Sequence, residues 1–226
     1  MDGSIIILRD KPQVNPEAYF SRKKEYGINL QAVCDWNRRF IYVSMGHPAA
    51  AHDSTAFKDS RLYKNRSSYF HNHEYLLADK AYSLEKHIIV PYKDLHAQVP
   101  SEAAFNYQLS IPHVKIEHAF GVLKARFPSL RSLPVRIGLD QQQGHNRVMM
   151  WISTCLVLHN WLHSIQEEED WLDEFLSPHD NQIQVQRAEN ERVNEQANAE
   201  VRAGRIRREE LVNKVKEIVG AGVPAS

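Results

Sequence analysis

One stretch of this 226-residue chain decides its fold, namely Ile116-Glu117-His118-Ala119-Phe120-Gly121-Val122-Leu123-Lys124-Ala125-Arg126-Phe127. From Ile116 to Phe127 the large apolar residues recur at spacings of four, three and four, as they do along one side of an α-helix. Pro112 stands where a first helical turn begins, and Pro128 ends the pattern. The stretch therefore predicts an amphipathic helix that packs by one flank against a larger core.

The same helix carries a polar ridge beside its apolar stripe. At 100° per residue, Gly121 and Lys124 lie about 40° and about 20° from Glu117, whereas the stripe is centred about 90° away. The helix can thus offer Glu117 to a metal ion, Gly121 to a close backbone and Lys124 to a phosphate. Taken alone, an acid near a helix start is explained by the helix dipole, and Lys124 is equally well explained as a surface lysine.

Strand-like runs precede this helix. Residues 4–8, 28–34 and 40–45 predict three strands, and the polar residues 35–39 predict a hairpin turn between the last two. The run 75–78 predicts a buried strand ending at Asp79, and residues 88–90 predict a further strand. Asp53 supplies a helix N-cap, with a helix expected to reach residue 62 or 63. The element order predicts an α/β domain with a mixed sheet.

The end of the chain differs in composition from its body. A second long helix is predicted from about Gly144 to Trp161, and it is expected to be buried because it is apolar nearly all round. After Ile165 an acidic run leads to an apolar group (Trp171, Leu172, Phe175 and Leu176) that could dock back on the core. Residues 181–219 are polar and predict a helical extension or a disordered tail. We therefore expect a body over residues 1–165 and a tail over residues 166–226.

The formal net charge of zero conceals an uneven distribution of charge. Residues 1–165 contain 20 lysines and arginines against 14 acids, a net charge of +6, whereas residues 166–226 contain 8 against 14, a net charge of −6. A basic body suits a polyanionic partner, although solvated surface explains the same count. Cys34 and Cys155 lie in apolar runs, which is typical of a reducing compartment. Neither a membrane span nor a secretory signal is predicted.

Three acids stand where the predicted elements could carry them into one cleft. Asp2 precedes the first strand, Asp79 closes a later strand, and Glu117 lies on the helix. Carboxylates in close proximity repel one another unless they share cations, and Mg²⁺ or Mn²⁺ prefers oxygen ligands. Two such ions, roughly 3.5–4 Å apart, can activate a water and stabilise the leaving oxygen of a phosphodiester. Singly, Asp2 is equally a chain-terminal surface acid, and Asp79 is more simply a turn former.

Five ordered segments resemble the Harbinger/PIF-type DDE transposases. Asp2-Gly3-Ser4 resembles the family's Asp-Gly-Thr/Ser, and residues 29–35 resemble its second strand. Residues 46–54 are similar to its Gly-x-Pro-Gly-Ser-x-His-Asp-Ser loop, residues 77–82 to its second-acid motif, and residues 116–127 to its third-acid helix. Ile5 stands where the family usually has histidine, and Ala81 where it has glycine. None of these departures removes a carboxylate.

This resemblance covers about residues 2 to 163 and implies a ribonuclease H-like fold for a DDE nuclease domain over residues 1–165. It implies metal-dependent cleavage and transfer of DNA strands in the nucleus, with Asp2, Asp79 and Glu117 as catalytic ligands of two Mg²⁺ or Mn²⁺ ions. Asp53 is either the N-cap already described or an accessory metal ligand. DNA contacts are expected from five basic side chains, namely Lys124, Arg126, Lys80, Arg22 and Lys23.

Family members also tend to work with a separate Myb-like DNA-binding protein, so the resemblance implies such a partner. Because the chain begins one residue before Asp2, we expect its domain to be truncated at the N-terminus, without the strand residues and helix-turn-helix region that come first in the family. The alternative is a domesticated, catalytically silent domain that binds DNA or a partner protein. The sequence leaves the oligomeric state open.

Overall fold

The computed structural model describes residues 1–71, 73–93, 99–165 and 195–221, and these fall into two compact units. The sheet unit comprises Asp2–Lys64 and the described residues from Lys115 onward up to Ile165. The α7 unit comprises Met1, the described residues of Asn65–Val114, and the C-terminal helix.

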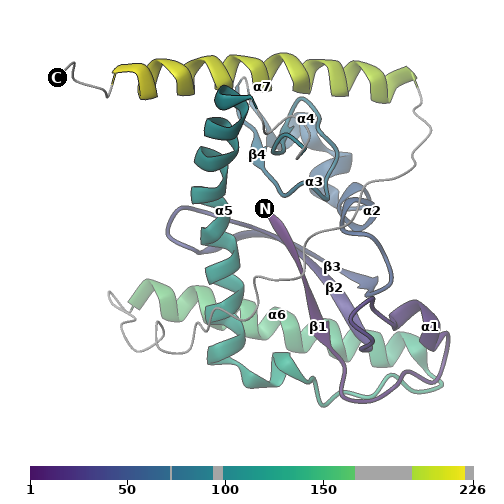
Figure 1. Ribbon diagram of the computed structural model, residues 1–226. Helices are drawn as coiled ribbons and strands as arrows, with labels where there is room; N and C mark the ends of the chain where they lie inside the picture. Colours follow the sequence, from purple (N-terminus) through teal and green to yellow (C-terminus); the bar gives the residue numbers. More distant parts are fainter. Residues whose placement is uncertain (72, 94–98, 166–194, 222–226) are drawn as a thin grey trace. The chain divides into compact units, whose positions relative to one another are not determined.

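The sheet unit is built on a three-stranded antiparallel sheet in the order β1-β2-β3 (Figure 1). Its strands are β1 (Asp2–Ile7), β2 (Gly27–Cys34) and β3 (Phe40–Pro48). The second half of α5 (Pro100–Arg126), η1 (Pro128–Arg131) and α6 (Gln141–Ile165) supply the helical layer. Three short helices complete it: α1 (Pro16–Tyr19), α2 (Asp53–Lys58) and α3 (Arg61–Lys64).

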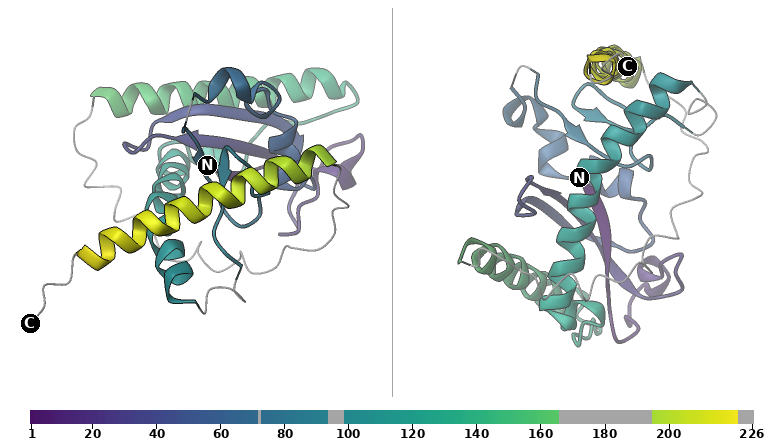
Figure 2. Two further views of the ribbon diagram at one scale, coloured as in Figure 1. Left: turned by 90° about the horizontal axis from the view of Figure 1, so that it is seen from above. Right: turned by 60° about the vertical axis from the view of Figure 1, so that its left-hand side comes forward.

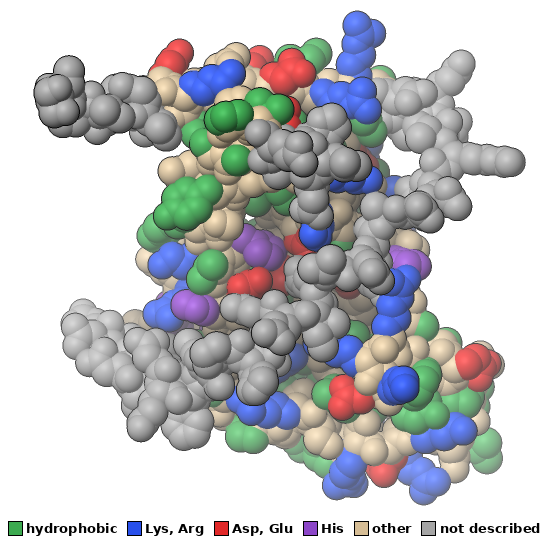
Figure 3. Space-filling view, viewed as in Figure 1, with side chains coloured by type: hydrophobic (Ala, Val, Ile, Leu, Met, Phe, Trp, Pro, Cys, Tyr) green, Lys and Arg blue, Asp and Glu red, His purple; other side chains and the backbone are tan. Residues whose placement is uncertain are grey.

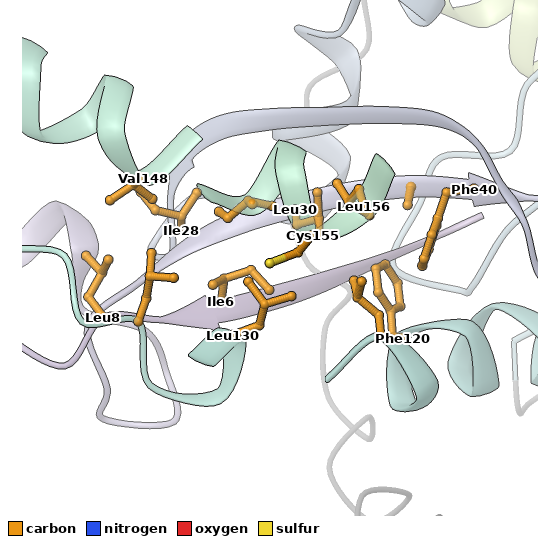
Figure 4. Close-up of a cluster of buried hydrophobic side chains, with 14 of the residues drawn as sticks. Ile6, Leu8, Ile28, Leu30, Phe40, Phe120, Leu130, Val148, Cys155 and Leu156 are labelled. Atoms are coloured by element: carbon orange, nitrogen blue, oxygen red, sulfur yellow. The ribbon is translucent and has the colours of Figure 1, made fainter. Parts of the chain in front are cut away.

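The core of this unit lies between the sheet and the helices. Side chains from all three strands point toward those of α5, η1 and α6 (Figure 4). Ile6, Leu30 and Leu123 are completely buried, and the rings of Phe40 and Phe120 have centroids 5.5 Å apart. Full burial of a side chain of this size stabilises the folded state by about 1.5–3 kcal/mol.

The α7 unit has a smaller core. Two short parallel strands, β4 (Leu76–Leu77) and β5 (Ile88–Ile89), are joined there by α4 (Arg66–Tyr69), the first half of α5 and α7 (Glu195–Ala221). Ile89, Phe105, Leu109 and Val212 form its buried cluster. Of the predicted tail the structure describes only α7, which is helical and supplies Val212 to this cluster.

The predicted hairpin is confirmed, with the amide of Asp35 donating to Arg39 O at 3.0 Å. The predicted start of the third-acid helix is wrong, because α5 begins at Pro100 and contains Pro112 in its interior. Pro112 costs that helix one backbone hydrogen bond but has a helix-compatible φ. Asp53 is not an N-cap either. His52 holds that position, and the expected single helix is divided into α2 and α3.

The predicted α/β arrangement is confirmed, but the antiparallel and parallel strands form two separate sheets instead of the one mixed sheet that was expected. The ribonuclease H-like fold and the division at residue 165 stay predictions. Helix α6 is buried along one side only, because Met150, Val157 and Trp161 are well exposed, so the expectation of full burial is wrong. The apolar group from Trp171 to Leu176 lies outside the described residues. Within the described part of the chain, no helix has both the length and the apolar character to cross a membrane.

Candidate metal and DNA site

Asp2 begins β1 and is only 7% exposed. It pairs with Ala32 across the sheet, so strand alternation places it on the same face as Ile6 and Leu30, the face that carries the core. The amide of Gly3 donates to Asp2 Oδ1 at 2.7 Å. An ionised carboxylate is costly to bury without hydrogen bonds, a counter-charge or a metal, and this position therefore favours a group with a chemical role.

Lys124 fixes the position of the Glu117 helix against β1. Its ammonium donates to Ile5 O at 3.2 Å. After α5 the chain runs through η1 to Leu133, whose amide donates to Ile7 O at 2.8 Å, so α5 and β1 run in the same direction. Glu117 lies about 10 Å back along the helix from Lys124, and Asp2 about 10 Å back along the strand from Ile5. Asp2 and Glu117 therefore lie at the same end of the sheet unit.

The burial pattern around Glu117 agrees with the predicted ridge. Ile116, Phe120 and Leu123 are buried at 1%, 6% and 0% exposure, whereas Glu117 is half-buried beside them. The helix packs by its apolar flank and leaves the carboxylate at the edge of the core. In the sheet unit, Asp2 and Glu117 thus lie at the same end, and Lys124 bonds the helix of one to the strand of the other.

Asp53 belongs to a buried polar network on the other face of the sheet. Its Oδ1 accepts hydrogen bonds from Asn29 Nδ2 at 2.8 Å and from Gln31 Nε2 at 3.0 Å. Gln31 Nε2 also lies 2.7 Å from Asn29 Oδ1, and Asn29 Nδ2 lies 3.3 Å from Ala51 O. Both amide side chains are only 2% exposed. The network ties the start of α2 to β2.

Gly3 lies directly against this network. A Cβ at Gly3 would come within 2.4 Å of Gln31 Nε2 and 2.7 Å of Asp53 Oδ1, so only glycine fits without a shift. Gly3 pairs with Gln31, and Ile5 pairs with Asn29, which places this network opposite the face of Asp2. Asp53 therefore contacts the backbone next to Asp2 from behind. The sequence interpretation missed Asn29 and Gln31, although two amides alternating with Ile28, Leu30 and Ala32 are a visible period-two signal.

Asp79 belongs to the α7 unit and stands just after β4. The amide of Ala78 donates to Ile89 O at 2.9 Å, which holds the end of this strand beside β5. Asp79 Oδ1 accepts from the amide of Ala81 at 2.9 Å, and the amide of Tyr82 donates to Asp79 O at 3.1 Å. Backbone bonds thus fix the acid at a tight turn, as its position after an apolar run predicted. Lys80 occupies the same turn.

His113 is a neighbour of Asp79 that sequence reasoning did not single out. Burial lowers the pKa of His113, the ammonium of Met1 lowers it further, and the negative charge of Asp79 opposes both effects. His113 precedes Glu117 by four residues in α5. Because residues four apart lie on the same face of a helix, this spacing could have indicated that His113 lies on the face of Glu117.

The expected DNA-contacting cations lie in different surroundings. Arg126 is half-buried and donates from Nη1 to His159 O at 3.2 Å, and burial lowers the pKa of its guanidinium. Arg22 and Lys23 are exposed in the turn between α1 and β2. On the face shown in Figure 3, basic side chains are scattered rather than gathered in one patch. Those described cations therefore differ in how readily they can reach a phosphate.

Asp2, Glu117 and Asp53 belong to the sheet unit, and Asp79 belongs to the α7 unit. Among the residues that the structure describes, no three His, Cys, Asp or Glu side chains lie together as a ready-made metal site. The donor types nevertheless fit a hard cation, because the candidate ligands are all carboxylates.

Comparison with known proteins agrees with the sequence motifs. The chain is 26% identical over 183 residues to "Protein ALP1-like" from Arabidopsis thaliana, an alignment that covers 74% of this chain and 43% of that protein. The chain thus spans less than half the length of this relative. No solved structure matches it. Residues 1–160 match the model of the DDE superfamily endonucleases, and the chain therefore belongs to that family.

Proposed function

We propose that the chain is the catalytic core of a metal-dependent DNA endonuclease of the Harbinger transposase type. Membership of the DDE superfamily endonucleases supports a DNA phosphodiester as the substrate. The observation that carries the proposal is the anchoring of α5 on β1 through Lys124, which sets Glu117 and Asp2 at one end of the sheet unit. Asp79 is the third ligand, held by its turn after β4.

Each acid has a defined part in this proposal. Asp2, Asp79 and Glu117 hold two Mg²⁺ or Mn²⁺ ions, which supply activation of a water and stabilisation of the leaving oxygen. Lys124 holds the helix on β1 and, together with Lys80, Arg126, Arg22 and Lys23, contacts the DNA backbone. Because Asp53 bonds Asn29 and Gln31 on the face of the sheet opposite Asp2, and lies against Gly3, we assign Asp53 to positioning the backbone of Gly3 and not to the accessory metal-ligand role.

The setting of the reaction is also part of the proposal. Cleavage and strand transfer take place in the nucleus, and a separate Myb-like DNA-binding protein chooses the target. Cys34 and Cys155 are free thiols in the structure, which suits that reducing compartment.

Cleavage of an end-labelled DNA duplex by the purified chain, with Mg²⁺ or Mn²⁺ added, tests the assignment. Asp79→Asn and Glu117→Gln each remove one ligand charge, and we expect each to lower the cleavage rate by on the order of 10³-fold. Asp10→Asn is the matched control, because Asp10 is a charged residue beside Arg9, 3.6 Å away, outside the proposed site. Full activity in both ligand variants would overturn the proposal.

Titration calorimetry with Mn²⁺ separates the proposal from a catalytically silent, DNA-binding or protein-binding domain. A nuclease core binds Mn²⁺, and the binding weakens in Asp2→Asn and in Glu117→Gln. A folded wild-type chain that binds DNA but neither takes up Mn²⁺ nor cuts the duplex would favour the silent domain.

A further inference from the structure

Helix α6 presents apolar side chains on two opposite sides. In both views of Figure 2, α6 runs along the three-stranded sheet. One side of α6 packs into the core of the sheet unit through Val148 and Leu156 (Figure 4) and through Ile152, and these three side chains are 0–4% exposed. On the opposite side Met150, Val157 and Trp161 are 69%, 68% and 57% exposed. A row of large apolar side chains exposed along one side of a helix marks a surface that commonly packs against a partner, so the second side of α6 is a candidate docking surface.

The exposed side has the spacing of a helix–helix seam. Six residues recur at intervals of three and four along it, namely Arg147, Met150, Thr154, Val157, Trp161 and Ser164. Alternating intervals of three and four residues are the pattern by which one helix packs along another. We call these six residues the α6 seam. The occupant that fits it best is therefore another helix.

The α6 seam offers that helix few hydrogen-bonding groups or charges to pair with. Thr154 Oγ1 donates to Met150 O at 2.9 Å, and Ser164 Oγ donates to Trp161 O at 2.6 Å, so both hydroxyls are bonded within their own helix. Gln141–Ile165 contains no aspartate or glutamate, and Arg147 is its single lysine or arginine. A strongly charged partner helix would lose the solvation of its charges here and find almost none to pair with.

The seam is complementary to itself when a second copy of α6 lies antiparallel. With Thr154 opposite Val157 of the partner subunit, Met150 falls opposite Trp161 of the partner subunit, and Arg147 opposite Ser164 of the partner subunit. The middle pair is small, and the flanking pair joins a thioether to an indole, a favourable contact. Each Arg147 also reaches the C-terminal turn of the partner helix, where the negative end of the helix dipole favours a cation.

From this self-complementarity we infer that the chain forms a two-fold symmetric dimer through antiparallel packing of α6 on α6. Such an interface is isologous, because the same six residues form both halves. It closes the assembly at two copies and covers the second apolar side of the helix.

Sedimentation velocity of the full chain at micromolar concentration tests the inference. We expect a dimer, and Trp161→Glu should weaken it by roughly 100-fold because two buried acids would face an apolar seam. Leu139→Glu is the matched control, since Leu139 is 83% exposed but lies outside α6, and it should leave the dimer intact. Circular dichroism checks that both variants fold. If Trp161→Glu does not fold, Val157→Glu replaces it as the seam variant in the same measurement.

Cysteine cross-linking tests the antiparallel arrangement. A mixture of Thr154→Cys and Val157→Cys chains should give a disulfide-linked dimer, whereas either variant alone should cross-link no more than the wild type does. Cross-linking of each variant with itself would indicate parallel helices and overturn the inference. A wild-type chain that stays monomeric, with Trp161→Glu lowering its melting temperature, would also overturn it, because residues 171–176 of the same chain would then be the occupant.

Discussion

The two units of this protein hold their candidate acids in unequal ways. In the sheet unit, three strands, η1 and two long helices enclose one continuous core, and Asp2 and Glu117 lie at its edge. In the α7 unit, Asp79 follows a two-residue strand, and the buried cluster is limited to Ile89, Phe105, Leu109 and Val212. Two of the candidate carboxylates thus belong to the unit with the larger hydrophobic core, and the third belongs to the unit with the smaller core.

That difference gives the C-terminal helix a structural role next to the turn of Asp79. Val212 of α7 completes the cluster that backs β5, and β5 holds the end of β4 through the bond from Ala78 to Ile89. Arg208 of α7 places its guanidinium 3.7 Å from the ring centroid of Tyr92 in the same unit. Loss of these contacts would release the turn that carries Asp79, although α7 bears none of the proposed catalytic acids.

The largest expected effect comes from making the same substitution in both cores. Phe105→Ala and Phe120→Ala each empty a buried aromatic site, at 4% and 6% exposure, and each should cost about 3–5 kcal/mol of stability. Because the core of the α7 unit is small, this loss should unfold that unit as a whole. The sheet unit has the larger core and should keep its fold. Hydrogen exchange read by mass spectrometry measures the two units separately.

Under Phe105→Ala, amides around Asp79 should exchange rapidly while those of β1 and β2 keep their protection. Phe120→Ala should lower protection in the sheet unit more than in the α7 unit. Equal loss of protection in both units under either variant would show that the two units unfold together, and that they do not differ in stability.

Low pH should destabilise the sheet unit, because its core contains the buried side chain of His159. This residue is 1% exposed, and its pKa is lowered to about 4 by burial first and by the charges of Arg126 and His163 next. In the unfolded chain His159 binds its proton near pH 6.5. The contribution of neutral His159 to the free energy of unfolding is therefore fully present above pH 6.5, and it is lost as the pH falls toward 4. The loss should approach roughly 3 kcal/mol.

Urea titrations followed by the hydrogen exchange of β2 measure that loss. The matched variant is His159→Phe, which keeps an aromatic ring beside Phe40, whose centroid is 5.2 Å from that of His159. It should flatten the dependence on pH between 6.5 and 4. A slope unchanged in His159→Phe would assign the acid sensitivity to other groups.

Local sequence signals predicted the strands and the hairpin because each was specified by neighbouring residues. Alternation, apolar runs and a five-residue polar turn determine β1, β2 and β3 with little help from the rest of the chain. The start of α5 was missed because Pro112 is a strong local breaker that tertiary packing of Phe105 and Leu109 overrides. One exposed side of α6 was missed because hydrophobicity alone does not say what covers a helix.

The candidate site was predicted in part for the same reason. Glu117 and Lys124 share a ridge that helix geometry alone requires, and the bond from Lys124 to Ile5 O agrees with it. The role of Asp53 depended on Asn29 and Gln31, which reach it across the sheet from another element. Contacts of this kind arise from strand register and packing, so no local pattern could fix them.

The smallest expected effect tests how α7 docks. A Cβ at Gly204 would come within 2.6–2.9 Å of the backbone of Glu85, which cannot swing aside as a side chain can. Gly204→Ala gains about 1 kcal/mol of helix propensity, yet overpacking costs roughly 1–3 kcal/mol, so a net destabilisation of about 1 kcal/mol is expected. Lys214→Ala, on an exposed site of the same helix, should leave stability almost unchanged. A Gly204→Ala chain with slower exchange around β5 would mean that the helix does not approach Glu85 so closely.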